Sequence, residues 1–401
     1  MFLSKIQKYS LIVPFWLLAF IWLIQNTTGY WQIRMEEESI FEYVYTQTTI
    51  YNISMLCIFF LFVCHVLYYF KAFSRSIPQS LFYIYIFVLL ISVLFWIEAL
   101  LYHDTSFVSM IRMPLNPLFC LIYVYVVLAF DEDLFHLLVK NVLLVSVIFL
   151  LIDIYLLVTR FETAFAFGIS PLMQFRTAAF WGFVFYLVCK PDINRKYFFI
   201  LLIGFLLCTF IGAIIISRSW IIQGLLSLIL LFFCYYRQNV NKTFPIFIFV
   251  IFIVLLFIYG YYVFKDTGSY EFLMNKMYND SRSGQYFAVM EQFSFYDFLL
   301  GGGAFTMWIQ NNVEYAYIDN QTIFFMYRYG LLLVLFYYLL VLFPAVKIFF
   351  SKRSSKIPYF LFMWVLAING LAVFNGVNWD WPNLLVMVAC GRCWFLLKNE
   401  G

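Results

Sequence analysis

The residues best suited to chemistry in this sequence are arginines that adjoin or interrupt apolar runs. Arg218 stands in a short polar turn, Arg176 opens an apolar run, and Arg328 follows Asn320 by about 12 Å of helix at about 1.5 Å per residue. A charge at membrane depth is unfavourable and usually faces a partner or a water-filled cavity. A planar guanidinium binds phosphate or carboxylate oxygens through paired hydrogen bonds. These arginines therefore indicate an anionic ligand.

The elements that must position these arginines are membrane helices, because the composition excludes a soluble fold. Hydrophobic residues make up 65% of the 401 positions, charged residues only 11%, and the mean hydropathy is +0.90. Disordered, coiled-coil and disulfide-stabilised proteins are more polar or richer in cysteine. Because one crossing needs about 20 apolar residues, about twelve crossings leave too little chain for a second large domain. We predict one all-α, polytopic transmembrane domain over residues 1–401.

The expected membrane helices follow apolar runs that are separated by polar turns. They lie at about 11–24, 48–70, 77–101, 113–130, 142–158, 175–189, 197–216, 220–236, 243–264, 320–349, 357–377 and 383–397. No signal-peptidase site follows the first run, so we expect a retained helix. Cytoplasmic termini put the lysine-rich turns on the cytoplasmic side, as the positive-inside rule requires. The long loop between the ninth and tenth helices, residues 265–315, then faces outward.

The cations of the predicted outer side are mostly arginines, whereas lysines dominate the cytoplasmic turns. The outer arginines are Arg34, Arg112, Arg160, Arg176, Arg218, Arg282 and Arg328. Either residue type would serve orientation, so the bias favours an anionic ligand outside. The alternative is that these arginines pair with outer carboxylates such as Glu36.

The long loop is rich in aromatic rings and amides and contains the glycine run 301–303. Rings stack on sugars and amides bond hydroxyls, so the composition favours a sugar-handling lid over a packed domain. Trp308 and Gly302 are the candidate glycan contacts, since a glycine backbone can approach a ligand closely. The alternatives are that the rings anchor interfacial helices and that the glycines end a helix.

The order of these motifs resembles the O-antigen polymerase (Wzy) and O-antigen ligase superfamily. The resemblance spans about residues 170–335 and rests on the motifs around Arg176, 216–220, 281–284, 300–305 and 319–331. It implies a glycosyltransferase of the bacterial inner membrane that acts at the periplasmic face without a cofactor or a metal. The implied partners are undecaprenyl-pyrophosphate-linked oligosaccharide and membrane lipid, with a chain-length regulator as a further candidate and no nucleic acid.

Two departures from the superfamily pattern bear on this resemblance. Ligases carry an important histidine in the large periplasmic loop, whereas residues 265–315 contain none, which favours a polymerase. Some polymerases carry an arginine followed by a glycine at a fixed distance, but Arg282 is followed by Gly284 and by 301–303 instead.

Polymerisation would join a hydroxyl to the anomeric carbon of a glycan whose leaving group is a lipid pyrophosphate. Charge builds on the departing phosphate, and preorganised guanidinium groups would stabilise it. The expected catalytic arginines are Arg176, Arg218 and Arg282. Substrate binding is expected from Arg328 and Asn320.

The attacking hydroxyl also needs a general base on the outer side. Asp319, Glu291 and His103 are the candidates, and the sequence does not rank them.

A ligase, or a flippase or secondary transporter of lipid-linked oligosaccharides, is the alternative function. The chain shows no internal repeat of the kind many transporters have. Cys390 and Cys393 have redox-motif spacing but lie in an apolar run, so we expect structural burial. Asp153 lies inside a predicted span, where it serves either as a proton-relay group or as a hydrogen-bond partner of a neighbouring helix.

Overall fold

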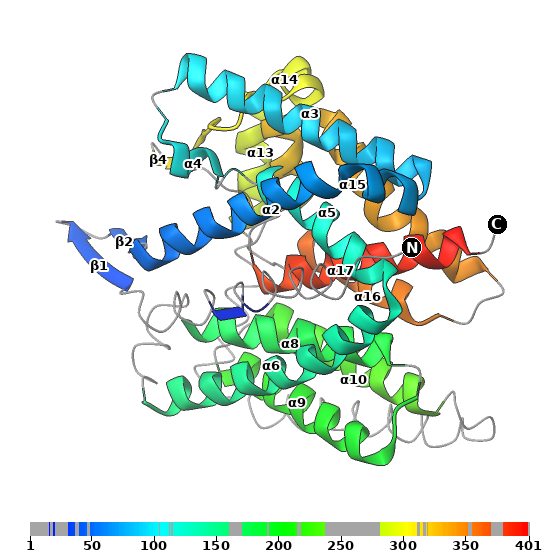
Figure 1. Cartoon of the computed structure of the whole chain (residues 1–401). Coiled ribbons are helices and arrows are strands. Elements are labelled where there is room, and N and C mark those ends of the chain that lie inside the picture. The colour runs from blue at the N-terminus through cyan, green and yellow to red at the C-terminus, as the bar shows by residue number, and fades with distance from the viewer. Residues whose placement is uncertain are drawn as a thin grey trace.

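The fold is a bundle of long helices (Figure 1). The computed structural model describes residues 16, 19–20, 31–36, 40–45, 49–103, 105–111, 113, 115–159, 171–190, 192–214, 218–236, 281–310, 313–315, 318, 320–351, 355–369 and 380–399. The predicted all-α membrane architecture is confirmed at this coarse level, with two short hairpins added. The predicted helix at 243–264 and most of the one at 11–24 lie outside the described residues.

The long helices coincide with apolar runs, because those runs have the length and composition of membrane helices. They are α2 (Thr49–Ser76), α3 (Gln79–Tyr102), α5 (Leu115–Phe130), α6 (Glu132–Thr159), α8 (Pro171–Cys189), α9 (Arg195–Ile214), α10 (Arg218–Tyr236), α15 (Gln321–Phe350), α16 (Ile357–Asn369) and α17 (Trp381–Lys398).

Shorter elements connect the long helices, and the sequence did not predict them. They are the helices α4 (Phe107–Ile111), α13 (Ser281–Gln292) and α14 (Phe295–Leu300), and the antiparallel hairpins β1 (Trp31–Glu36) with β2 (Ile40–Tyr45) and β3 (Trp308–Gln310) with β4 (Val313–Tyr315). Elements α13, α14, β3 and β4 belong to the long loop.

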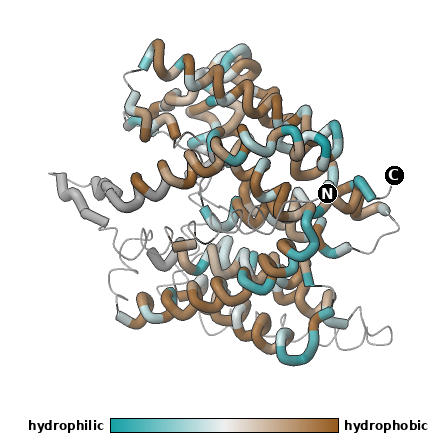
Figure 2. Tube along the Cα trace, viewed as in Figure 1, coloured by the Kyte–Doolittle hydropathy of each residue, from teal (hydrophilic) through white to brown (hydrophobic). Residues whose placement is uncertain are grey.

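Six of the described helices are long and apolar enough to cross a membrane. They contain Leu56–Ser76, Gln79–Tyr102, Glu132–Thr159, Arg195–Ile214, Ser219–Tyr236 and Gln321–Phe350. Figure 2 shows apolar residues along most of their length. Side chains that point out of the bundle are apolar as well, and Leu67 and Leu101 are 77% and 70% exposed. A hydrocarbon environment suits such a surface, because a helix satisfies all of its backbone hydrogen-bonding groups internally.

Helices α5 and α17 lie at the centre of the bundle. Helix α17 packs against α5, α8, α15 and α16, and its residues 381–391 are all buried. A Cβ on Gly391 would lie 2.8 Å from the Cα of Val126, so the lack of a side chain lets α5 and α17 approach closely. Cys390 and Cys393 are buried free thiols, which confirms the predicted structural burial.

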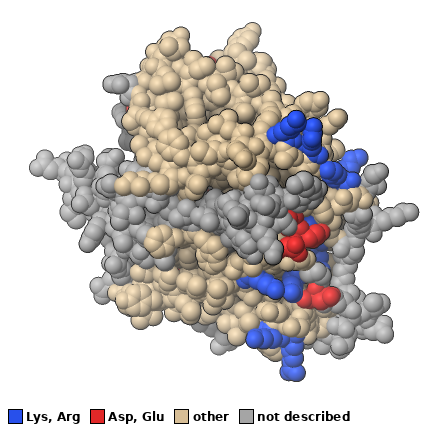
Figure 3. Space-filling model, in the orientation of Figure 1, with Lys and Arg blue, Asp and Glu red and all other residues tan. Residues whose placement is uncertain are grey.

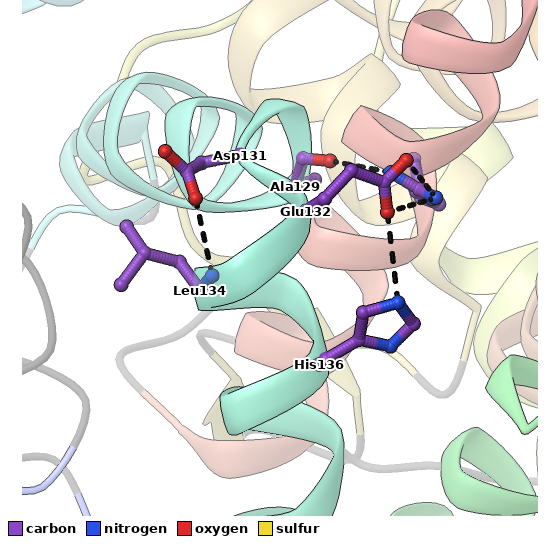
Figure 4. Close-up of polar contacts among 6 residues, drawn as sticks. Ala129, Asp131, Glu132, Leu134 and His136 are labelled. Carbon is purple, nitrogen blue, oxygen red and sulfur yellow. Dashed lines mark hydrogen bonds and ion pairs between the residues drawn. The ribbon is translucent and has the colours of Figure 1, made fainter. Parts of the chain in front are cut away.

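The described lysines and arginines gather at one end of the bundle on the face seen in Figure 3. At this end α17 is bonded to the start of α6, because Nη2 of Arg392 lies 2.7 Å from both carboxylate oxygens of Glu132. Figure 4 shows the same carboxylate facing His136, whose Nε2 is 3.7 Å away. Nζ of Lys398 also donates to the carbonyl oxygen of Ser76 at 2.6 Å, which joins the ends of α17 and α2.

Helix α6 begins at Glu132, well before the apolar run predicted at 142–158. The side chain of Asp131 accepts a 3.2 Å hydrogen bond from the backbone N–H of Leu134, and two acidic residues occupy the first turn. Both features stabilise a helix N-terminus. Hydropathy marks where a helix enters hydrocarbon, so it misses a polar first section.

Candidate active site

The described residues contain a carboxylate and imidazole pair at the end of α3. Nε2 of His103 lies 3.3 Å from Oε1 of Glu98, and the two side chains are 42% and 30% exposed. Helix α3 ends at Tyr102, and the next residue, His103, has an extended backbone that donates its N–H to the carbonyl oxygen of Ala99 at 3.1 Å. A carboxylate in this position fixes the orientation of the ring. With Nε2 held by Glu98, Nδ1 is the nitrogen that remains for a ligand.

The glycine run 301–303 lies directly beside this pair, docked on a break in α15. Helix α15 is interrupted at Gly330, which has a φ of 84°. The N–H groups of Gly302 and Gly303 donate to the carbonyl oxygens of Tyr327 and Arg328, at 2.8 and 3.1 Å. The loop therefore satisfies backbone acceptors of α15 near the break, as buried backbone groups require.

Glycine is required here by the close approach of two backbones. Gly301 and Gly330 both have positive φ, and a Cβ on either would lie 2.6 Å from a backbone oxygen of the facing segment. Gly301 also ends α14 by donating its N–H to the carbonyl oxygen of Asp297 at 2.7 Å. The glycines thus end a helix, as one of the alternatives predicted, and then pack against α15.

Glu98 connects the histidine to the long loop. Its Oε2 accepts a 3.5 Å hydrogen bond from the backbone N–H of Ala304, and a Cβ on Gly303 would lie 2.6 Å from its Oε1. The ring of Phe305 lies 5.0 Å from that of His103. The position of the loop and the orientation of His103 therefore depend on the same carboxylate.

An open depression of about 590 Å³ adjoins His103. Its lining residues are Tyr102, His103, Thr105, Ser106, Ser109 and Phe305. Hydroxyl groups and aromatic rings are the groups that proteins use to bind sugar hydroxyls and the apolar faces of sugar rings. The depression therefore combines a proton-accepting group with a lining that suits a carbohydrate.

The rest of the described loop packs with the first part of α15 around a second, small apolar core. We call this core the cap core, and it contains Val289, Phe298, Trp308, Ile318 and Tyr327. Trp308 has no exposed surface and stacks on Tyr315 with ring centroids 4.9 Å apart. Through this core the described part of the loop packs against α15. Trp308 therefore presents no free ring face to a glycan in this conformation.

The other predicted substrate-binding residues are placed as follows. Arg328 is buried next to the cap core, with its guanidinium carbon 4.9 Å from the ring centroid of Phe324. Asn320 caps α15 by accepting from the N–H of Ile323 at 3.1 Å and donates to the carbonyl oxygen of Asn369 at 3.1 Å. Gly302 is exposed, and Glu291 is exposed near the end of α13. Of these residues, Gly302 and Arg328 take part in the backbone contacts between the glycine run and α15.

Arg176 lies in a different part of the bundle, formed by α6, α8, α9 and α10 (Figure 1). It is fully buried, and its guanidinium donates to the carbonyl oxygens of Cys208 and Trp220 and to Oε1 of Gln223, at 3.3, 3.0 and 3.2 Å. The rings of Phe180 and Trp220 lie 4.6 and 4.5 Å from its guanidinium carbon. These contacts join α8 to α9 and α10.

Three predicted catalytic residues cannot be placed as side chains. The side chains of Arg218 and Arg282, which belong to the first turns of α10 and α13, lie outside the described part of the chain, as does all of Asp319. Among the described residues, no group of three or more histidine, cysteine, aspartate or glutamate side chains could hold a metal ion.

Sequence reasoning missed Glu98, although a signal was present. A glutamate inside the predicted span 77–101, a little more than one turn before a histidine, is an ionisable residue at membrane depth and therefore a candidate for function. The sequence does not indicate that Glu98 contacts a loop 206 residues further along the chain.

Comparison with known proteins adds no assignment. No family model matches the chain, and no curated protein matches it.

Proposed function

We propose that this protein polymerises undecaprenyl-pyrophosphate-linked oligosaccharide repeat units at the periplasmic face of the bacterial inner membrane. The proposal includes about twelve crossings, cytoplasmic termini and a periplasmic loop at 265–315. It is supported by the gathering of described lysines and arginines at the end of the bundle where α2 ends and α17 ends (Figure 3). By the positive-inside rule that end is cytoplasmic. Glu98, His103 and the cap core then belong to the periplasmic end.

The observation that carries the proposal is the pair formed by His103 and Glu98 beside a depression lined by hydroxyls and rings. Glycosyl transfer needs a base within hydrogen-bond reach of the attacking hydroxyl. It also needs a surface that holds the sugar in a fixed orientation. In this protein both features meet at one place, and the long loop closes against them through Gly303 and Ala304.

In the proposed reaction, His103 takes the proton from a hydroxyl of the incoming repeat unit. The hydroxyl oxygen forms a bond to the anomeric carbon of the growing glycan, and the bond from that carbon to the pyrophosphate oxygen breaks. The pyrophosphate leaves with the electron pair, and guanidinium groups stabilise its charge. Arg282 remains the candidate for this role from the sequence, with Arg328 beside the loop. Arg218, the other sequence candidate, begins α10 in the part of the bundle that holds Arg176. Glu98 orients the ring of His103 and stabilises its protonated form.

The test is a deletion of the gene followed by electrophoresis of the surface glycan, with variants returned on a plasmid. We expect His103→Ala to leave single repeat units and Glu98→Gln to shorten or abolish the ladder. His136→Ala is the matched control, because His136 pairs with Glu132 at the opposite end of the bundle. Protein amounts in the membrane must be equal. A normal ladder from His103→Ala would show that His103 is not the general base.

The deletion also separates the alternative functions. Loss of a polymerase leaves single repeats on the lipid core, loss of a ligase leaves no glycan there, and loss of a flippase retains repeat units on the cytoplasmic face. Either of the last two outcomes would contradict polymerisation as the function.

A further inference from the structure

Helix α14 carries an apolar surface that the protein leaves uncovered. Phe295, Tyr296 and Leu300 are 74%, 71% and 69% exposed, whereas Phe298 on the other side enters the cap core. The acidic residue of this helix does not lie free on that surface, because Asp297 Oδ2 accepts hydrogen bonds from the backbone N–H and the hydroxyl of Ser294, both at 2.7 Å. Exposed apolar side chains grouped in this way mark a contact surface.

The depth of α14 follows from what its end is bonded to. The loop that follows it donates to the carbonyl oxygens of Tyr327 and Arg328, which lie roughly 10 Å into α15 at 1.5 Å per residue. It also donates to Glu98, about 6 Å before the end of α3. Both helices are apolar enough to cross a membrane. The end of α14 is thus level with residues inside two candidate spans.

At this depth, α14 contacts the same environment as the outward-facing side chains of those two helices. On α3, Leu94, Ile97 and Leu101 are 64%, 47% and 70% exposed close to the level of Glu98. Helix α14 lies at the edge of the bundle in Figure 1, and backbone contacts with α15 hold its inner side. Irregular backbone is tolerated at membrane depth only where protein satisfies it, and the bonds of Gly302, Gly303 and Ala304 meet that condition.

We propose that α14 lies in the boundary of the outer leaflet, with Phe295, Tyr296 and Leu300 in contact with lipid acyl chains. The pair formed by Glu98 and His103 then opens at the level of the headgroups, beside a helix embedded in lipid. An aromatic belt at this level is the usual anchor of a membrane protein. The inference concerns where the loop lies, so it holds or fails independently of the reaction.

The test uses spin labels in proteoliposomes that contain the full chain. Cys57 and Cys64 are the exposed cysteines and are replaced by serine, and the other six are buried. Single cysteines are then introduced as Tyr296→Cys and Leu300→Cys and labelled with a nitroxide. Collision rates are measured with oxygen, which concentrates in hydrocarbon, and with a water-soluble nickel chelate. Leu94→Cys is the lipid-facing control, and the exposed Glu314→Cys of β4 is the aqueous control.

We expect labels at 296 and 300 to collide more often with oxygen than with nickel, as the label at 94 does, and the label at 314 to show the reverse. Because the substituted side chains are exposed, the variants should fold, and each of the two positions tests the surface by itself. More frequent collisions with nickel at both positions would overturn the proposal. The glycan ladder of cells that carry the unlabelled cysteine variants tests the reaction separately.

Discussion

Gly303 lies so close to Glu98 that a Cβ on the glycine would stand 2.6 Å from the Oε1 atom of the glutamate. That oxygen is the one that faces Nε2 of His103. The glycine also has a φ of 107°, a conformation that residues with a side chain rarely adopt. One backbone position in the long loop therefore determines whether the carboxylate can hold the histidine.

Gly303→Ala should abolish or strongly shorten the polymer, because the added methyl group must displace Glu98 from His103 or displace the loop from α15. Gly302→Ala is the comparison variant, in which we expect a smaller effect. Its backbone needs no positive φ, and its Cβ would lie 2.9 Å from Oγ1 of Thr306 and 3.2 Å from the carbonyl oxygen of Tyr327, away from Glu98. The measurement is the glycan ladder at equal protein amounts. Equal ladders from the two alanine variants would show that the contact with Glu98 is irrelevant to the reaction.

Trp308→Ala should destabilise the packed part of the loop by about 3–5 kcal/mol, which is typical of emptying a buried aromatic site. Phe287→Ala on α13 removes a ring that is 68% exposed and should have little effect. The rate at which a protease cleaves the loop in membrane vesicles measures the difference. We also expect shorter glycan chains, because a loosened cap holds the growing glycan less well. Equal cleavage rates would mean that the cap core does not hold the loop together.

The sequence was sufficient to predict most of the described long helices, because apolar length is a local property. The pairing of Glu98 with His103 was within reach, since both lie near the end of one predicted span.

The remaining features of the site depend on contacts between distant segments. Trp308 was predicted as a glycan contact because an aromatic ring in a polar loop suits that role, but its ring is enclosed by residues of α13, α14 and α15. The sequence predicted that Arg176 lies at the outer membrane boundary and binds an anionic ligand. The structure instead shows its guanidinium bonded to groups of α9 and α10 that come later in the chain. A local sequence pattern does not indicate which hydrogen-bond acceptors a buried arginine will contact.

The start of α14 should loosen at low pH. The hydroxyl and the backbone N–H of Ser294 hold the pKa of Asp297 below its usual value by bonding the charged carboxylate. A lowered pKa in the folded state means that this contribution to stability is present above the unfolded pKa and is lost as the pH falls through the folded pKa. A nitroxide at position 296 should therefore become more mobile only in acid. In Asp297→Asn, which cannot ionise, mobility that still changes with acid would assign the effect to another group.

Arg176 offers the sharpest separation of a structural role from a catalytic one. Its three bonds and the electrostatic interaction with buried Asp153 predict that Arg176→Ala lowers stability by roughly 3 kcal/mol. Lysine cannot reach all three acceptors, so Arg176→Lys should be intermediate.

The measurement is thermal unfolding of purified protein in detergent, with Arg195→Ala, at an exposed position near the start of α9, as the control. If Arg176 joins α8 to α9 and α10, the melting temperature and the amount of protein in the membrane fall together with polymer length in the order arginine, lysine, alanine. If it stabilises the leaving pyrophosphate, as its position in the sequence suggested, both variants melt like the natural protein and yet make only single repeats. The contacts around its guanidinium favour the first outcome, because groups already bonded within the bundle would have to release it before it could bind a phosphate.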